Sequence, residues 1–309
     1  MNSPQIISLL AAAITAGTAI LFAALGEIIT ERSGVLNLGV EGMMLAGAVM
    51  GFMSSYRTGN IWLGVIIAMF AGGILACIHA FLTVTLKANQ VVSGLALTMF
   101  GTGLSAYIGK SLIGIPAINT FKPIMIFLLS DIPVIGQIFF QQNALVYLSY
   151  VLAVIIWFVL FKTRIGLNIR AVGENPAAAD AMGINVFLTR YIAIIFGGMF
   201  AGLGGAYLSL SYAPAWLENM TSGRGWIAVA MVIFSSWNPL RALAGSYFFG
   251  GIDALGYRLQ IIGVRVPSYF LRMLPYLLTI AVLIISNLNK KNRKNTPAAL
   301  GTSYDREER

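Results

Sequence analysis

Long apolar runs alternate with short polar interruptions along almost the whole chain. A helix that crosses a bilayer needs about 20 predominantly apolar residues. Nine runs approach that length, at 5–25, 35–54, 61–86, 91–109, 143–161, 190–211, 225–238, 240–259 and 268–286. The pattern predicts an all-α polytopic membrane protein with about nine transmembrane helices, and eight to ten are compatible with it.

Two segments interrupt this pattern. Asn238-Pro239 follows the seventh run directly, and we expect a break there because proline disfavours helix in the residue before it. The segment 112–142 is apolar but carries Pro116, Pro123 and Pro133. We expect short helices or a re-entrant element there, outside the bilayer core. The small-residue pattern Gly47-x-x-x-Gly51 recurs as Gly198-x-x-x-Gly202 and predicts close helix packing.

The composition supports a membrane protein. Hydrophobic residues make up 58% of the 309 residues and charged residues 10%, whereas soluble domains carry roughly 25% charged residues. The mean hydropathy is +0.82. A soluble fold of this size lacks the interior to bury so much apolar surface. Soluble enzymes, disulfide scaffolds and disordered chains are therefore excluded.

The positive charge is concentrated at two places, the 162–190 segment and the tail. Six of the twenty lysine and arginine residues follow Asn289. Such clusters mark the cytoplasmic side of a membrane protein. With nine spans the N-terminus would then be external, and with ten both termini would be internal. We expect one transmembrane domain over 1–288, with its main inner loop at about 164–187, and a disordered cytoplasmic tail over 289–309.

The sequence lacks the groups that catalysis or metal binding require. It has one histidine, His79, and one cysteine, Cys77, with no acidic cluster beside them, so we expect no catalytic residue, no metal site and no cofactor on this chain. Arginine and aromatic residues do not interleave, which excludes a nucleic-acid partner. We expect His79 to be a buried, hydrogen-bonded structural group. A pathway role is the alternative, because ionisable residues within spans are often functional.

Polar residues also stand at the start of the second run. Asn37 and Glu41 lie one helical turn apart, among Gly34, Gly39 and Gly42, and each such glycine weakens a helix by about 1 kcal/mol relative to alanine. A glycine-broken segment of this kind exposes backbone to a polar pathway in transporters. The alternative is a structural turn in which Glu41 pairs with an arginine. The residues leave both interpretations open.

The 164–184 loop contains a helix signal. Asn175 is a suitable N-cap, and Pro176 suits the first helical position. Gly183 is placed to end the helix, so a short alanine-rich helix is predicted over 177–182. Such a helix suits docking into a groove on a partner.

Three stretches together resemble one protein family. The run Ala171-Val-Gly-Glu-Asn-Pro-Ala-Ala-Ala-Asp-Ala-Met-Gly-Ile184 is similar to the cytoplasmic coupling loop of ATP-binding cassette importer permeases. The run Gly34-Val-Leu-Asn-Leu-Gly-Val-Glu-Gly-Met-Met-Leu45 resembles the second span of the branch that handles branched-chain amino acids, ribose-type sugars and nucleosides. The third stretch runs from Gly223 to Gly250. The resemblance covers about 20–285.

Within that branch, Leu36-Asn-Leu-Gly-Val-Glu-Gly42 looks most like the shorter nucleoside permease, which works with a basic-membrane-protein-type lipoprotein. The resemblance implies a permease subunit in a bacterial plasma membrane, with three partners: a second permease, a cytoplasmic ATPase that binds the ATP, and an extracellular substrate-binding lipoprotein. It implies that Gly173, Asn175, Pro176, Ala178, Ala179 and Gly183 couple the chain to the ATPase. Residues suited to lining a nucleoside pathway are Asn37, Glu41, Asn89, Gln90 and Ser93.

Other functions stay open from the sequence. The same importer class could take a ribose-like sugar, riboflavin or a branched-chain amino acid. An ion-driven secondary transporter would need no ATPase, and a membrane-embedded enzyme would need a nucleophile–base pair. Asp253, deep in the eighth run, fits either a structural ion pair or a lining residue.

Overall fold

The computed structural model describes residues 3–261, 267–288 and 295–306. Each of the nine predicted runs contains a helix. The long helices are α1 (Ser3–Arg32), α2 (Val40–Thr58), α3 (Ile61–Ala80), α4 (Gln90–Gly109), α6 (Ala144–Lys162), α9 (Val186–Tyr207), α11 (Pro239–Ile261) and α12 (Ser268–Leu288). The shorter helices are α5 (Ile135–Phe139), α7 (Arg164–Glu174), α8 (Pro176–Ala181) and α10 (Arg224–Phe234).

Two helices continue as π-helical turns, η1 (Phe81–Thr85) after α3 and η3 (Leu208–Tyr212) after α9. The segment 112–142 forms short elements, as predicted. The 3-10 turn η2 (Lys110–Leu112) precedes it, and β1 (Pro123–Met125) pairs antiparallel with β2 (Gln141–Asn143) around α5.

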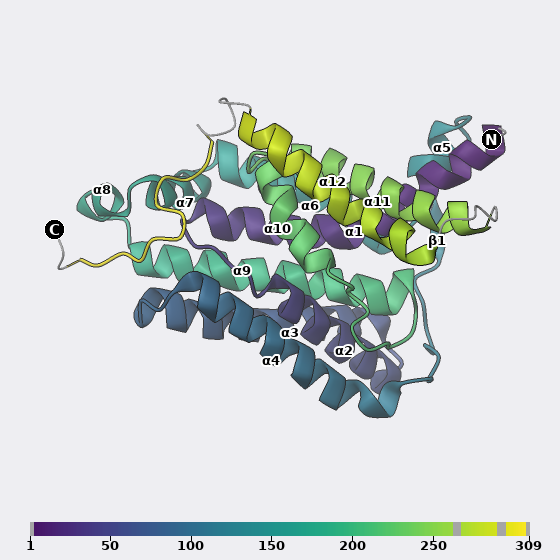
Figure 1. The fold of residues 1–309 in the computed structure, drawn as a ribbon, viewed down its shortest axis with the longest axis horizontal. Coiled ribbons are helices and arrows are strands. Elements are labelled where there is room, and N and C mark those ends of the chain that lie inside the picture. The colour runs from purple at the N-terminus through teal and green to yellow at the C-terminus, as the bar shows by residue number, and fades with distance from the viewer. Residues whose placement is uncertain (1–2, 262–266, 289–294, 307–309) are drawn as a thin grey trace.

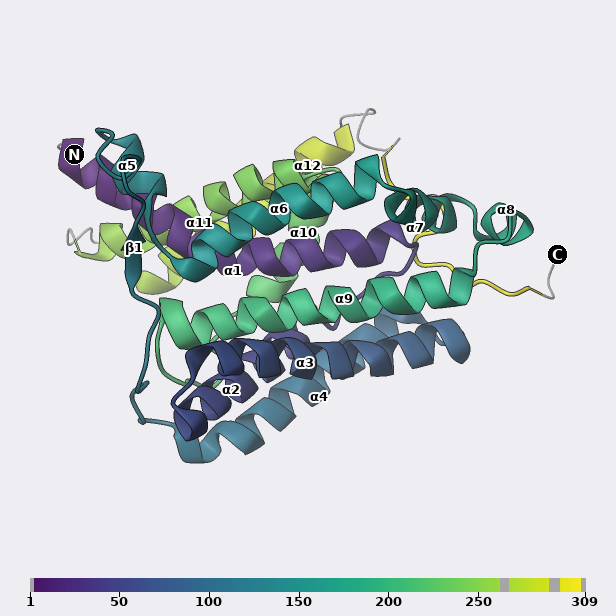
Figure 2. The same ribbon diagram turned by 180° about the vertical axis from the view of Figure 1, so that it is seen from behind.

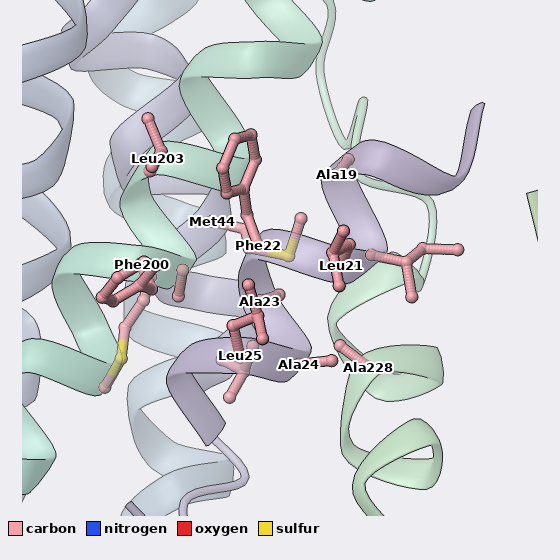
Figure 3. Packing of buried hydrophobic residues seen from close by; sticks show 14 of the residues in the cluster. Ala19, Leu21, Phe22, Ala23, Ala24, Leu25, Met44, Phe200, Leu203 and Ala228 are labelled. Carbon is pink, nitrogen blue, oxygen red and sulfur yellow. The ribbon is translucent and has the colours of Figure 1, made fainter. Parts of the chain in front are cut away.

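Helix α1 is the centre of the bundle. On one side of it lie α9, α2, α3 and α4, and on the other lie α6, α10, α11 and α12 (Figures 1 and 2). The side chains of α1 are buried along most of its length. Phe22 and Leu25 of α1 lie close to Met44 of α2 and Phe200 of α9 (Figure 3). This apolar centre fixes the positions of the helices that carry the polar groups described below.

Small residues let α9 approach α2 and α3 closely. A Cβ atom at Gly47 would lie 2.4 Å from the Gly202 carbonyl oxygen, and one at Gly72 would lie 2.2 Å from the Gly198 carbonyl oxygen. No larger residue fits at these positions without moving a backbone. The small-residue patterns therefore pack helices, as predicted.

The structure supports a membrane protein but does not confirm nine spans. Five of the described helices are long and apolar enough to cross a membrane, at Pro4–Arg32, Ile61–Thr85, Gln90–Leu112, Ala144–Lys162 and Val186–Tyr212. α10 has 11 residues, a length of about 16 Å, and is too short to cross alone. The predicted break at Asn238-Pro239 is confirmed, because α10 ends at Phe234 and α11 begins at Pro239.

The tail differs from the expectation of disorder. Residues 295–306 follow one path along the α8 end of the bundle (Figure 1), and Pro297, Ala299 and Tyr304 are buried there. The polar composition was misleading because the backbone of this segment finds hydrogen-bond partners on the bundle. The rest of the predicted tail, 289–294 and 307–309, lies outside the described residues.

Candidate functional site

The connection between α1 and α2 is a buried polar turn. The backbone N–H of Asn37 donates to the Glu27 carboxylate at 3.0 Å, and the Asn37 side-chain oxygen accepts the N–H of Gly39 at 2.9 Å. Asn37 and Glu27 are almost completely buried. An asparagine that bonds the backbone two residues on forms its own turn, so Asn37 stabilises the non-helical segment before α2.

Side chains from α3 and α4 bind the same turn. Gln90 accepts the N–H of Leu36 at 2.7 Å, and His79 Nε2 lies 3.1 Å from the Leu36 carbonyl oxygen. Because a carbonyl oxygen only accepts, His79 donates from Nε2, and its Nδ1 accepts the Ser93 hydroxyl at 3.0 Å. His79 is therefore a buried, hydrogen-bonded group, as predicted. Asn89 lies apart, exposed, and caps α4 by accepting the N–H of Val92 at 3.1 Å.

Glu41 binds the N-terminus of α10. Its carboxylate accepts the Thr221 hydroxyl at 2.6 Å and the N–H groups of Gly223 and Gly225 at 2.7 and 2.6 Å. A carboxylate is favoured there because the first N–H groups of a helix lack intrahelical partners and carry partial positive charge. A Cβ atom at Gly225 would lie 2.6 Å from the Glu41 Cα, so glycine is required for this approach. The predicted alternative, a pairing of Glu41 with an arginine, is not what the structure shows.

The C-terminus of α10 is bound by residues at the end of α1. Arg32 donates to the carbonyl oxygens of Ser236 and Trp237, at 3.5 and 3.2 Å, and Trp237 Nε1 donates to Glu31 at 2.6 Å. These carbonyls belong to the turn directly after α10, which ends at Phe234, and a cation also suits the negative end of the helix dipole. We call Glu31, Arg32 and Glu41 the α10 clamp, since they hold both ends of this short helix.

A cavity of about 430 Å³ opens beside the N-terminus of α10. Arg224 is one of its polar lining residues. Its guanidinium donates to Asp253 at 2.8 Å and lies over the Tyr212 ring, 5.5 Å from the ring centre. The Tyr276 hydroxyl donates to the Ser222 carbonyl at 2.7 Å. Aromatic and polar groups thus line one space between η3, α10, α11 and α12. The wall includes Tyr212, Asn219, Arg224, Phe249, Asp253, Tyr257 and Tyr276.

The predicted pathway residues do not line this cavity in the described part of the chain. The structure brings Asn37, Gln90 and Ser93 together at the α1–α2 turn, places Glu41 at α10 and leaves Asn89 separate. Asp253 is both an ion-pair partner and a lining residue, which joins the two predicted alternatives. Sequence reasoning did not identify Tyr212 and Arg224, although a charged residue directly before an apolar run was a usable signal.

The predicted coupling loop contains two helices. Asn175 caps α8 by accepting the Ala178 N–H at 3.0 Å, and Pro176 is the first helical residue. Gly183 follows the helix with φ +83°, and Ile184 donates to the Ala179 carbonyl at 3.0 Å, which is the usual glycine-terminated helix end. The short helix is thus confirmed within one residue at each end, while α7 was not predicted.

The coupling residues divide into exposed and buried positions. Ala178 and Gly183 are exposed, whereas Ala179 is buried. Gly173 is buried at the end of α7, where a Cβ atom would lie 2.2 Å from the Arg32 carbonyl oxygen. α8 therefore presents one face outward, and α7 contacts the residue that holds α10.

Comparisons with known proteins show which proteins this chain is similar to. It is 37% identical to "Guanosine ABC transporter permease protein NupQ" of Bacillus subtilis, over 98% of each chain. It is 36% identical to "Nucleoside ABC transporter permease protein NupC" of Lactococcus lactis, over 92% of this chain and 93% of the relative. It is 46% identical to "Putative glucose ABC transporter permease protein TsgC13" of Haloferax volcanii, over 97% of this chain and 98% of the relative.

A family profile matches nearly the same extent of the chain. The family is described as branched-chain amino acid transport system / permease component, and the match covers residues 9–283. Since this is most of the 309 residues, the chain is a multi-pass transport component rather than an enzyme, and it belongs to this family of permeases.

Proposed function

We propose that this chain is the permease subunit of an ATP-binding cassette importer for nucleosides. The substrate class is inferred from the cavity beside α10. Its volume of about 430 Å³ falls within the range of small-molecule sites. The Tyr212, Tyr257 and Tyr276 rings suit stacking on a flat base, and Arg224 with Asp253 suits hydrogen bonding to base edges and ribose hydroxyls. The similarity to NupQ and NupC supports the same substrate class.

A glucose-type sugar is the second candidate. The 46% identity to a relative with a glucose name supports it, and the hydroxyl groups of a hexose would use the same Arg224–Asp253 pair. The tyrosines favour the nucleoside, because a sugar has no flat base to stack.

The proposed importer has three further components. The relatives are named as permease proteins of ABC transporters, so we place ATP binding on a separate cytoplasmic ATPase, with a second permease beside this chain and an extracellular lipoprotein that delivers substrate. The chain would lie in a bacterial plasma membrane with its α8 end in the cytoplasm. The exposed Ala178 on α8 would face the ATPase.

The contacts suggest how ATPase movement would reach the cavity. Displacement of α8 would move α7, whose Gly173 lies against the Arg32 carbonyl. Arg32 holds the C-terminus of α10, and Glu41 holds the N-terminus, next to the cavity. The α10 clamp would thus pass movement between the two regions through a continuous chain of contacts. A pathway role for Asn37, Glu41, Asn89, Gln90 and Ser93 stays a prediction.

The experiment compares uptake of labelled guanosine, uridine and glucose in cells that lack this chain and keep the other importer components. The wild-type chain should restore guanosine or uridine uptake, and unlabelled nucleoside should compete. Restoration of glucose uptake alone would move the substrate to the sugar class. Restoration of none of the three would contradict the proposed substrate.

A further inference from the structure

The segment 295–306, which we call the strap, crosses the α8 end of the bundle and touches several separate elements (Figures 1 and 2). Ala299 donates its N–H to the Gly173 carbonyl at 3.0 Å, and Gly301 donates to the Gly34 carbonyl at 3.2 Å. The first contact is on α7, and the second is on the α1–α2 turn. The strap therefore joins the coupling loop to the polar turn.

The middle of the strap reaches the α4 side of the bundle. The Thr302 carbonyl accepts from Arg190 at 3.3 Å and from Gln90 at 3.5 Å, and Asp305 forms an ion pair with Lys87. Arg190 is 1% exposed, and a buried guanidinium requires hydrogen-bond acceptors. The strap provides one of them.

The end of the strap holds α8 itself. Arg306 donates to both carboxylate oxygens of Asp180, from Nε at 2.8 Å and from Nη2 at 2.7 Å, and the Tyr304 hydroxyl donates to the same carboxylate at 2.9 Å. The Asp180 side chain is 5% exposed. A two-point arginine–carboxylate pair fixes orientation as well as distance, so it holds α8 in one position.

Tyr304 also completes a small apolar core beneath the coupling loop. It packs with Val172 of α7, Ala179 of α8 and Val186 of α9, and its ring lies 6.1 Å from that of Phe187. The strap thus supplies a buried aromatic side chain to the element proposed to meet the ATPase.

Without the strap, α8 has few connections to the bundle. Among the described helices it packs on α7 and α9, its neighbours in sequence. We propose that the strap braces α8 and carries its displacement to the α1–α2 turn and the α3–α4 connection. Tyr304, Arg306 and Asp180 are positioning residues of the coupling element. The inference rests on the proposed ATPase coupling at α8.

The first arm of the test is independent of substrate. A spin label at Ala181→Cys, in a Cys77→Ser chain within the assembled importer, reports the mobility of α8. Deleting 295–309 or changing Arg306→Ala should increase that mobility, and the exchanged pair Asp180→Arg with Arg306→Asp should restore order. Two matched controls should leave the mobility of α8 unchanged. One deletes only 307–309, and the other is Arg241→Ala, at an exposed arginine at the same end of the bundle. Unchanged mobility without the strap would overturn the brace.

The second arm measures transport and ATP hydrolysis with each variant at equal membrane abundance. Arg306→Ala and Tyr304→Phe together should lower uptake at least about fivefold, the lower end of ordinary coupling between sites, while ATP hydrolysis continues. Normal uptake by the chain that lacks 295–309 would overturn the coupling role. If the wild type carries neither nucleoside nor glucose but α8 mobility responds as expected, the proposed substrate fails and the brace stands.

Discussion

The carboxylate of Glu41 accepts the backbone N–H of Gly225 at 2.6 Å and so joins the first turn of α2 to the first turn of α10. Arg32 and Glu31 bind the opposite end of α10. Charged residues within the eleven residues from Glu31 to Glu41 therefore bind both ends of a helix too short to cross a membrane alone. α10 cannot shift along its axis without breaking one set of these bonds.

Glu41→Gln should destabilise the permease by about 1–3 kcal/mol, the cost of leaving a buried donor without its partner. The amide keeps the shape of the side chain but directs its NH₂ group at the donors of Thr221, Gly223 or Gly225. Thermal unfolding of the purified importer in detergent measures the loss. Asp131→Asn, on an exposed connection, is the control, and equal stability of the two variants would contradict the capping role.

Trp237→Phe should also destabilise, because it removes the indole N–H that donates to buried Glu31 at 2.6 Å. The second Glu31 oxygen has no partner among the described residues. We expect the free energy of unfolding to fall by about 1–3 kcal/mol. The effect of Trp237→Phe should be smaller when Glu31 is also changed to methionine, since both polar groups are then gone. Trp62→Phe, at a half-exposed position, should be near neutral. If the double-mutant cycle shows no coupling between Trp237 and Glu31, their hydrogen bond does not contribute to stability.

Gly202→Ala should reduce the amount of folded protein, because the added Cβ would lie 2.2 Å from the Ala68 carbonyl oxygen. Overpacking of this kind costs about 1–3 kcal/mol. Gly103→Ala is a matched change within α4, where a Cβ meets no described atom within 4 Å, and it should be neutral or stabilising by up to about 1 kcal/mol. Fluorescence-detected gel filtration of the two variants provides the comparison, and an equal loss in both would argue against close packing at Gly202.

Asp253→Asn should weaken substrate handling, because Arg224 loses its ion-pair partner at 2.8 Å beside the cavity. We expect the half-saturating nucleoside concentration for uptake to rise about tenfold, which corresponds to about 1.4 kcal/mol. The neutral pair Arg224→Gln with Asp253→Asn separates structure from binding. This double variant should be about as stable as the wild type, whereas its half-saturating nucleoside concentration should stay raised. Full recovery of uptake would show that the pair is structural alone.

The sequence predicted the helices better than their relation to a membrane. Apolar runs locate helices because each buries its side chains against neighbours or lipid. They do not distinguish a buried half-length helix from a span, and α10 was therefore counted as one. The turn at Asn37 was recognisable from its glycines and polar residues. Its partners on α3, α4 and α10 depend on tertiary packing and were not predictable.

The parts of the candidate site that follow from local sequence were predicted, and the parts that depend on tertiary packing were not. The ends of α8 follow from local rules at Asn175, Pro176 and Gly183, and the structure confirms that helix. The cavity depends on Tyr212, Arg224 and Asp253, which three different elements bring together. The strap was missed because a polar composition predicts disorder unless the rest of the chain supplies partners, as Asp180 does for Arg306.

The central claim is that ATP-driven movement enters this permease at α8, and one measurement tests it most directly. Labelled guanosine uptake is compared between cells with the wild-type chain and cells with Ala178→Asp, at equal membrane abundance. Ala178 is exposed, so the charge should disturb the ATPase contact without unfolding the helix. Leu128→Asp, an exposed change at the opposite end of the bundle, is the control. The account predicts loss of uptake with Ala178→Asp and normal uptake with Leu128→Asp, whereas normal uptake by a well-inserted Ala178→Asp chain would contradict it.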